Sequence, residues 1–324
     1  MKARFWLALA LALGVAVLAG LALGPVRLGP SVVWAALLGH GDTSALSIVR
    51  TLRLPRIALG IAVGAGLGMS GAALQSTLRN ALAEPYLLGV SGGAAVGAVI
   101  GVMLHLSAPA VLPFAAFAGA GIAVLLVLVV ARAAGARGDP RVMVMAGVVV
   151  GAFANAAIMV LLSGAPDDAV RGALWWMMGS LGDASWAGTR WIALYVAAGG
   201  AALVGLGRDI ELLSLGEDSA AALGVEVEAA TRRVYLVASL VAAVTVAGAG
   251  LVGFVGLMVP AIVRALGART VRVLIVGSAL AGGALVVAAD VVARTARAPA
   301  ELPLGAVTAL IGVPFFLVRL RSMR

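Results

Sequence analysis

The sequence predicts an all-α integral membrane protein of about ten transmembrane helices, forming a single domain over residues 1–324. Hydrophobic residues make up 63% of the chain and charged residues only 11%, whereas soluble domains are about a quarter charged. The 43 glycines suit helices in lipid, where small residues let two backbones approach closely. No segment alternates apolar and polar residues over the length of a strand, so a membrane barrel is not indicated.

The chain begins with Lys2 and Arg4 before an apolar stretch, as a secretory signal does. Phe5–Gly24 is about 20 residues long, however, and a helix of that length reaches roughly 30 Å, enough to cross a bilayer. Because many apolar stretches follow, we expect an uncleaved first helix, with a signal peptide as the alternative. Pro25–Pro55 then predicts an amphipathic segment, which leads into the arginine-rich run Arg50–Arg56.

Nine further apolar stretches predict the remaining spans. They are about Ile57–Leu78, Leu87–Leu106, Phe114–Ala131, Val142–Ser163, Ala187–Leu206, Val234–Leu251, Val252–Leu266, Val271–Ala293 and Leu302–Val318. Val252–Leu266 is short, and we expect Pro260 to break it because proline removes a helical hydrogen bond. Leu174–Trp186 is rich in aromatic residues and methionine, which favours a short helix at the membrane interface.

The distribution of basic residues predicts the orientation. An even number of spans puts both termini on one side, and with the Lys2 end in the cytoplasm fifteen of the 23 basic residues lie inside. That excess fits the positive-inside rule and places both termini in the cytoplasm. Two arginine clusters, Arg50–Arg56 and Arg294–Arg297, then lie unexpectedly on the outer side.

The order of the spans indicates an internal repeat. Spans two to five and seven to ten form two sets of four, and the first span of each set enters the membrane from opposite sides. The two sets are therefore expected to be inverted relative to each other, as is common in transporters.

The longest polar interruption is Gly207–Arg233, which contains six of the 14 acidic residues. Glu217–Leu223 contains good helix formers and stops at Gly224, and Val225–Arg233 predicts a second helical piece. Two short helices hinged at a glycine on the cytoplasmic side would form a docking platform. The alternative is an ordinary solvated loop.

Several kinds of chemistry are missing. The span interiors are almost free of charge, so they lack the ionisable residues with which transporters bind coupling ions. A phosphate-binding loop needs a lysine, and the only lysine is Lys2. There is no cysteine, and the two histidines, His40 and His105, are too few for a histidine metal cluster. Each histidine could be a haem ligand, and the alternative is an ordinary histidine at the membrane interface. Energy must come from another subunit, or the protein is a passive channel.

Seven short segments along nearly the whole chain carry a further signal. They are RLPR at Arg53–Arg56, SGAALQ at Ser70–Gln75, RNALAEPYLLGVSGGA at Arg79–Ala94, WWMMGSL at Trp175–Leu181, LGEDSAAALGV at Leu215–Val225, GLVGFVGLMVPAIVR at Gly250–Arg264 and AELPLGAVTALIGVPFFL at Ala300–Leu317. Together, and in this order, they resemble the iron–siderophore, haem and cobalamin permease family of binding-protein-dependent ABC importers.

The resemblance implies the type II ABC importer permease fold and a homodimer with the pathway along its two-fold axis. It also implies two cytoplasmic ATPase subunits, a periplasmic substrate-binding protein and a place in the bacterial inner membrane. The chain itself would have no catalytic residue, metal or cofactor. Its Gly207–Arg233 platform would hold the coupling helices that contact the ATPase through Glu217, Asp218, Leu223 and Gly224, with Arg264 nearby. The alternative for the two acidic residues is simple stabilisation of a helix N-terminus.

Other positions match the family's pattern. Arg53, Arg56 and Arg294 match arginines that meet acidic residues of the binding protein, with interfacial snorkelling as the alternative. Asn80 and Leu82 match the inner gate. The helices around Met143–Ser163 and Leu302–Phe316 are candidates for the pathway lining, with polar side chains such as Asn155 and Thr308.

The chain departs from the family at Ala81, where proline is usual, and at Ala261, where histidine is usual. The first change leaves the turn less rigid, because proline fixes φ. The expected cargo is an iron chelate, a siderophore or haem complex, with cobalamin as the alternative. An autonomous secondary transporter or channel is the alternative from a different class.

Overall fold

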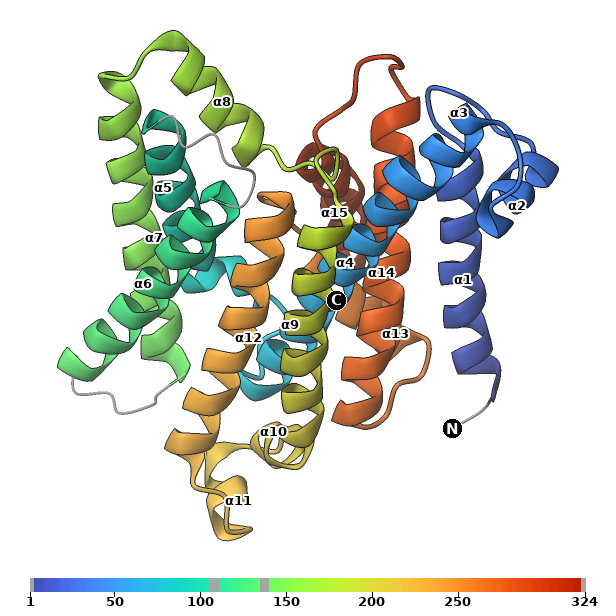
Figure 1. Cartoon of the computed structure of the whole chain (residues 1–324). Helices are drawn as coiled ribbons and strands as arrows, with labels where there is room; N and C mark the ends of the chain where they lie inside the picture. Colours follow the sequence, from blue (N-terminus) through green and yellow to red (C-terminus); the bar gives the residue numbers. More distant parts are fainter. Residues whose placement is uncertain (1–2, 105–110, 135–139, 322–324) are drawn as a thin grey trace.

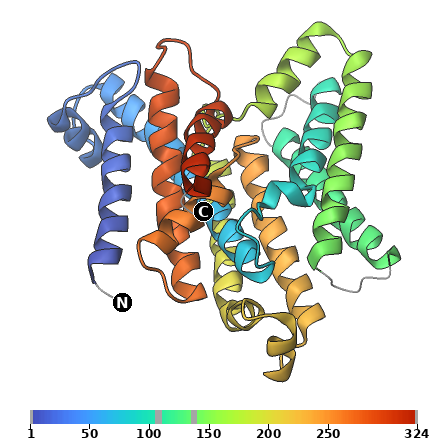
Figure 2. The same cartoon turned by 180° about the vertical axis from the view of Figure 1, so that it is seen from behind.

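The long helices of this computed structural model lie side by side as a bundle (Figures 1 and 2). The structure describes residues 3–104, 111–134 and 140–321, and every regular element within these ranges is helical. Seven helices there are long and apolar enough to cross a membrane. They are α1 (Ala3–Ala22), the continuous helix Thr43–Thr77 that contains α4 (Leu54–Thr77), α6 (Val111–Ala133), α7 (Pro140–Ser163), α9 (Trp186–Gly205), α12 (Val227–Ala249) and α14 (Val271–Thr295). The predicted all-α membrane class is confirmed.

Three shorter apolar helices occupy the places of the remaining predicted spans. They are α5 (Val90–Met103), α13 (Val255–Ala265) and α15 (Leu304–Arg321). α5 begins after the 3-10 turn η2 (Pro85–Leu88) and Gly89, whose φ of 81° interrupts the helix. Such interrupted helices are tolerated at membrane depth because neighbouring helices cover the freed backbone groups.

The central helix starts earlier than expected. Within the predicted connecting segment Pro25–Pro55, the structure has α2 (Pro30–Leu38) and α3 (Thr43–Leu46). A π-helical turn, η1 (Ser47–Arg53), then runs directly into α4. The apolar window of this continuous helix is 83% buried, so α4 forms the axis of the subunit.

Glycines let α4 pack against α14 and α13. Gly60, Gly64 and Gly68 recur at every fourth position and so share one face of α4. That face touches α14, and a methyl group added at Gly64 would collide with the backbone of Gly282. Gly71 meets the backbone of Gly256 in α13 in the same way.

The predicted break at Pro260 is wrong, because α13 runs continuously through that residue. A proline at this position leaves the carbonyl of Gly256, four residues earlier, without its helical donor. The Gln75 side chain of α4 supplies one: its Nε2 donates to Gly256 O at 3.2 Å and to Leu257 O at 3.1 Å. The interruption instead lies before α13, at Gly250 and Phe254, which both have positive φ.

The polar platform also differs in detail from its prediction. Its two short helices are α10 (Gly207–Leu213) and α11 (Glu217–Ala222), whereas Val225–Arg233 leads into the long helix α12. The short helices meet at Gly216, whose φ is 119°, and Gly224 lies between α11 and α12. Leu213, Ala220 and Ala230 pack together and hold the three helices as one unit. α11 protrudes from the end of the bundle where the N-terminus lies (Figures 1 and 2).

The predicted interfacial helix at Leu174–Trp186 is displaced towards the N-terminus. The helix found is α8 (Asp167–Met177), and it stops before Gly179, whose φ is 75°. Asp167 and Asp168 lie in its first turn, where carboxylates favour a helix N-terminus. α8 lies at the end of the bundle opposite α11 (Figure 1).

Candidate functional site

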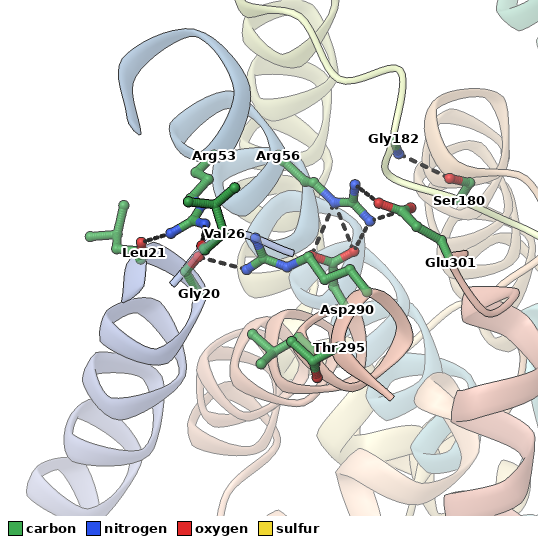
Figure 3. A network of polar contacts seen from close by, with 12 residues as sticks. Gly20, Leu21, Val26, Arg53, Arg56, Ser180, Gly182, Asp290, Thr295 and Glu301 are labelled. Atoms are coloured by element: carbon green, nitrogen blue, oxygen red, sulfur yellow. Dashed lines mark hydrogen bonds and ion pairs between the residues drawn. The ribbon is translucent and has the colours of Figure 1, made fainter. Parts of the chain in front are cut away.

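A cluster of charged side chains lies where α4 begins and α14 ends (Figure 3). In Figure 1 these two helix ends are opposite α11. At the centre of the cluster, Arg56 of α4 donates from Nε to Asp290 Oδ1 of α14 at 2.9 Å and from Nη2 to the same oxygen at 2.8 Å. The other edge of its guanidinium donates to the two carboxylate oxygens of Glu301 at 2.8 and 2.9 Å. A planar guanidinium is suited to such paired contacts, so Arg56 joins α4, α14 and the segment before α15.

Two more arginines complete the cluster by capping α1. Arg53 donates to the carbonyls of Leu21 and Val26, and Arg294 Nη2 donates to Gly20 O at 2.6 Å. Arg294 Nε also lies 3.3 Å from Asp290 Oδ2. Cations favour the C-terminal end of a helix, because the last carbonyls there have no helical donors.

The cluster is mostly hidden. Arg53 is 4% exposed and Arg294 is 3% exposed, so neither side chain is open to a partner in the single subunit, and their docking role stays a prediction. They do not snorkel towards water either, since their guanidinium groups end on carbonyls and a carboxylate. Glu301 is the member that solvent reaches, with 39% of its side chain exposed.

The ion pair between Arg56 and Glu301 should make stability depend on pH. The hydrogen bond from Arg56 lowers the pKa of the Glu301 carboxyl below its usual value, although partial burial opposes this. A carboxyl with a lowered folded-state pKa stabilises the fold above its unfolded-state pKa, and this contribution is lost as pH falls through the folded-state value. We expect the unfolding temperature of Glu301→Gln to change less than that of the wild type between neutral and acid pH. Equal changes in both proteins would contradict the ion pair.

The predicted inner gate lies in the turn after α4. Asn80 and Leu82 are both exposed there, and Asn80 Oδ1 accepts from Leu82 N at 2.9 Å. A side-chain amide that bonds the backbone two residues later closes a tight turn. This contact holds the turn although Ala81 replaces the usual proline. The structure thus brings Asn80 and Leu82 together, and their gating role stays a prediction.

Glu84 and Tyr86 join this turn to α13, a contact that the sequence did not reveal. Glu84 Oε1 accepts from Phe254 N at 2.8 Å, and the Tyr86 hydroxyl accepts from Val252 N at 3.0 Å. Phe254 has a φ of 67°, which is uncommon for a bulky residue, and it precedes α13. Its side chain also lies against Gly312 of α15, so the turn, α13 and α15 are connected through one residue.

The predicted ATPase-coupling residues lie at the end of the bundle opposite the charged cluster. Glu217, Asp218, Leu223 and Gly224 are all exposed on and beside α11, and Leu223 is 56% exposed. Arg264 lies apart from them in α13, where its Nη1 donates to Gln75 Oε1 at 2.7 Å and its Nη2 to Ser76 Oγ at 3.3 Å. It lines a cavity of about 410 Å³ beside α10.

The predicted lining residues have different environments. Asn155 is exposed on α7, whereas Thr308 is 1% exposed and its hydroxyl donates to Gly305 O at 3.0 Å. His40 is exposed after α2, and His105 lies outside the described residues. Within the described parts of the chain, no three His, Cys, Asp or Glu side chains are grouped as a metal ion would need.

Comparisons with known proteins agree with this architecture. The model of the FecCD transport family matches residues 11–322. The cobalamin import system permease protein BtuC of Halobacterium salinarum is 42% identical over 293 residues, which cover 90% of this chain and 78% of that protein. The hemin transport system permease protein HmuU of Yersinia pestis is 36% identical over 307 residues, which cover 92% and 90%.

A solved structure has the same fold. It is described as an inward-facing conformation of a metal-chelate type ABC transporter, and it aligns with a TM-score of 0.89 at 26% identity. The alignment covers 99% of this chain and 100% of that one. With a family model that matches nearly all of its length, the chain belongs to the FecCD transport family and is a permease subunit of an ABC importer.

Proposed function

We propose that this subunit forms the membrane passage through which an ATP-driven importer moves an iron chelate, a siderophore or haem complex, into the cytoplasm. The observation that carries the proposal is the pairing of an apolar helical bundle with an exposed platform, α10 and α11, at one end. The chain has no lysine besides Lys2 with which to build a phosphate-binding loop. ATP hydrolysis therefore takes place in a separate subunit, and the permease is not an enzyme.

Ten crossings in two inverted sets account for the order of the helices. The first set is α4, α5, α6 and α7, and the second is α12, α13, α14 and α15. Each set begins with a long helix that is largely buried, followed by a break in the α-helix and then a short α-helix. With α1 and α9 this makes an even number of crossings, which puts both termini on one side of the membrane. The excess of basic residues on that side would make it the cytoplasmic side of a bacterial membrane.

Two copies of the chain would enclose the pathway. The long helix α7 and the last helix α15 both expose large apolar side chains, among them Phe153, Met159 and Leu310, each more than 70% exposed. In a membrane such surfaces face lipid or a second subunit. In the homodimer, the exposed faces of α7 and α15 would line the pathway, and Asn155 would lie on the α7 face.

The two ends of the bundle would bind different partners. The platform, with Glu217, Asp218, Leu223 and Gly224, would enter a cleft on the ATPase subunit. At the other end, a periplasmic binding protein would dock over the charged cluster. Only Glu301 and the partly exposed Arg56 of that cluster are offered to it directly, because Arg53 and Arg294 are buried.

Transport in reconstituted vesicles tests the proposal. Vesicles that hold the permease, the ATPase and the binding protein should accumulate a radiolabelled iron chelate only when ATP is supplied. Vesicles with the permease alone should not accumulate it. Uphill uptake by the permease alone would contradict the proposal and favour an autonomous secondary transporter.

Cobalamin is the second candidate cargo. The Halobacterium salinarum relative that is 42% identical is named for cobalamin import, whereas relatives at 35% and 36% identity are named for ferric citrate and hemin. Direct binding of iron chelates and of cobalamin to the cognate binding protein separates the two. Accumulation of cobalamin and not of iron in the vesicle assay would select the second candidate.

A further inference from the structure

A cavity lies at the cytoplasmic end of α4, beside the platform. Its walls come from the end of α4 and the turn after it, from α10, and from the end of α13, the start of α14 and the segment between them. The volume of about 410 Å³ is within the range of small-molecule sites and gives ample room for a protein side chain. The lining residues are Gln75, Ser76, Arg79, Glu211, Ser214, Arg264, Ala268, Arg269, Thr270, Val271 and Leu274.

The cavity is positively charged. Arg79, Arg264 and Arg269 reach it from three separate segments, and Glu211 is the one carboxylate among the lining residues. Glu211 Oε2 accepts from Val271 N at 3.3 Å, at the start of α14, so its charge is directed to a helix N-terminus. The lining therefore favours the binding of an anion.

The floor of the cavity is organised in advance. Gln75 is 3% exposed, and because its Nε2 donates to two carbonyls of α13, its Oε1 is turned towards Arg264. Arg264 is held there by Gln75 and by Ser76. Arg79 and Arg269 are exposed, whereas Arg264 is partly buried, so an incoming group meets the exposed charges first and the held charge deeper inside.

The position of the cavity indicates which anion occupies it. α4 is the most buried of the long helices. A cavity at its end therefore lies on the central axis of the subunit and away from the surrounding lipid. A Cβ atom at Gly216, between α10 and α11, would lie 3.4 Å from Arg79 Nη1. The cavity is thus continuous with the platform to which we assign the ATPase.

We propose that this cavity is a second anchoring point for the ATPase subunit and that it takes an aspartate or glutamate side chain from it. The inference rests on the proposed function and adds a contact beyond α10 and α11. Charge pairs at the edge of an interface speed association and fix orientation, and they weaken as salt is added. The cavity would therefore set the register in which the platform enters the ATPase cleft.

The test measures binding of the purified ATPase subunit to the permease in nanodiscs at low and high salt. Arg79→Gln combined with Arg269→Gln should weaken binding at low salt about tenfold, equivalent to about 1.4 kcal/mol, and should flatten the salt dependence. Lysine at the same two positions should retain most of the binding, since the charge is kept. Arg132→Gln, which removes an exposed charge at the end of α6, should leave binding unchanged.

A separate variant distinguishes this inference from the proposed function. Leu223→Asp places a charge on the exposed side of the platform and should abolish ATPase binding. If it does so while the double glutamine variant binds like the wild type, the second anchoring point is overturned and the proposed function stands. If the ATPase subunit does not bind the wild-type permease, the proposed function fails.

The permease alone shows whether another anion occupies the cavity. Thermal unfolding is measured with inorganic phosphate in solution, and separately in nanodiscs with and without phosphatidylglycerol. We expect neither probe to stabilise the wild type more than the double glutamine variant. A stabilisation that requires Arg79 and Arg269 would assign the site to free phosphate in the first case or to a lipid headgroup in the second, and it would overturn the proposal.

Discussion

Replacing Asp290 with asparagine is expected to destabilise the subunit by about 3–5 kcal/mol, because breaking a buried ion pair leaves uncompensated charge. The Asp290 carboxylate is 2% exposed and lies between the guanidinium groups of Arg56 and Arg294. Glu301 would then be the one carboxylate left beside the three arginines of the cluster, and its ion pair is with Arg56. The loss should appear as a lower unfolding temperature in detergent and a smaller amount of protein in the membrane.

Glu301→Gln is the matched control, because Glu301 pairs with the same arginine. Its side chain is 39% exposed, so water can replace much of the interaction, and exposed pairs contribute about 0–1 kcal/mol. The two carboxylates thus have similar hydrogen bonds to Arg56 and very different burial. Equal destabilisation by the two variants would show that burial does not control the strength of this cluster.

The same cluster shows where sequence reasoning stops. Hydropathy depends on local composition, so it predicted the helical membrane class and the approximate places of the spans. Three arginines between Arg50 and Arg56 lower that hydropathy, and the start of the continuous helix Thr43–Thr77 was therefore assigned to a connecting segment. The partners of Arg53 are main-chain carbonyls, which every residue has, so no sequence pattern marks them.

Contacts between distant segments could not be predicted either, because local composition says nothing about which segments meet in the fold. Arg56 and Asp290 are separated by 234 positions, and Glu84 and Phe254 by 170. The resemblance to a family indicated residues such as Asn80, Leu82 and Leu223, and the structure places these in an exposed turn and on an exposed platform. It did not reveal that Gln75 satisfies the carbonyl left free by Pro260, because that contact depends on how α4 crosses α13.

That crossing gives the second large prediction, which concerns Gly71. A methyl group at this position would collide with the oxygen, carbonyl carbon and Cα of Gly256, all of them backbone atoms that cannot rotate away. Gly71→Ala must therefore push α13 from α4, which also strains the bond from Gln75 Nε2 to Gly256 O. Overpacking a tight core costs about 1–3 kcal/mol and occasionally more, and we expect about 3 kcal/mol here.

Gly121→Ala is the control for this substitution. Gly121 lies within α6, and no atom outside its own helix backbone and neighbours is within 4 Å of an added Cβ atom there. Alanine favours a helix over glycine by up to about 1 kcal/mol, so this variant should be neutral or slightly more stable. Unfolding temperatures of the two variants in the same detergent measure the difference. If Gly71→Ala were as stable as Gly121→Ala, α4 and α13 could not cross as closely as the Gly71–Gly256 contact requires. In that case α4 could not serve as the packed axis that links the charged cluster to the cavity beside α10.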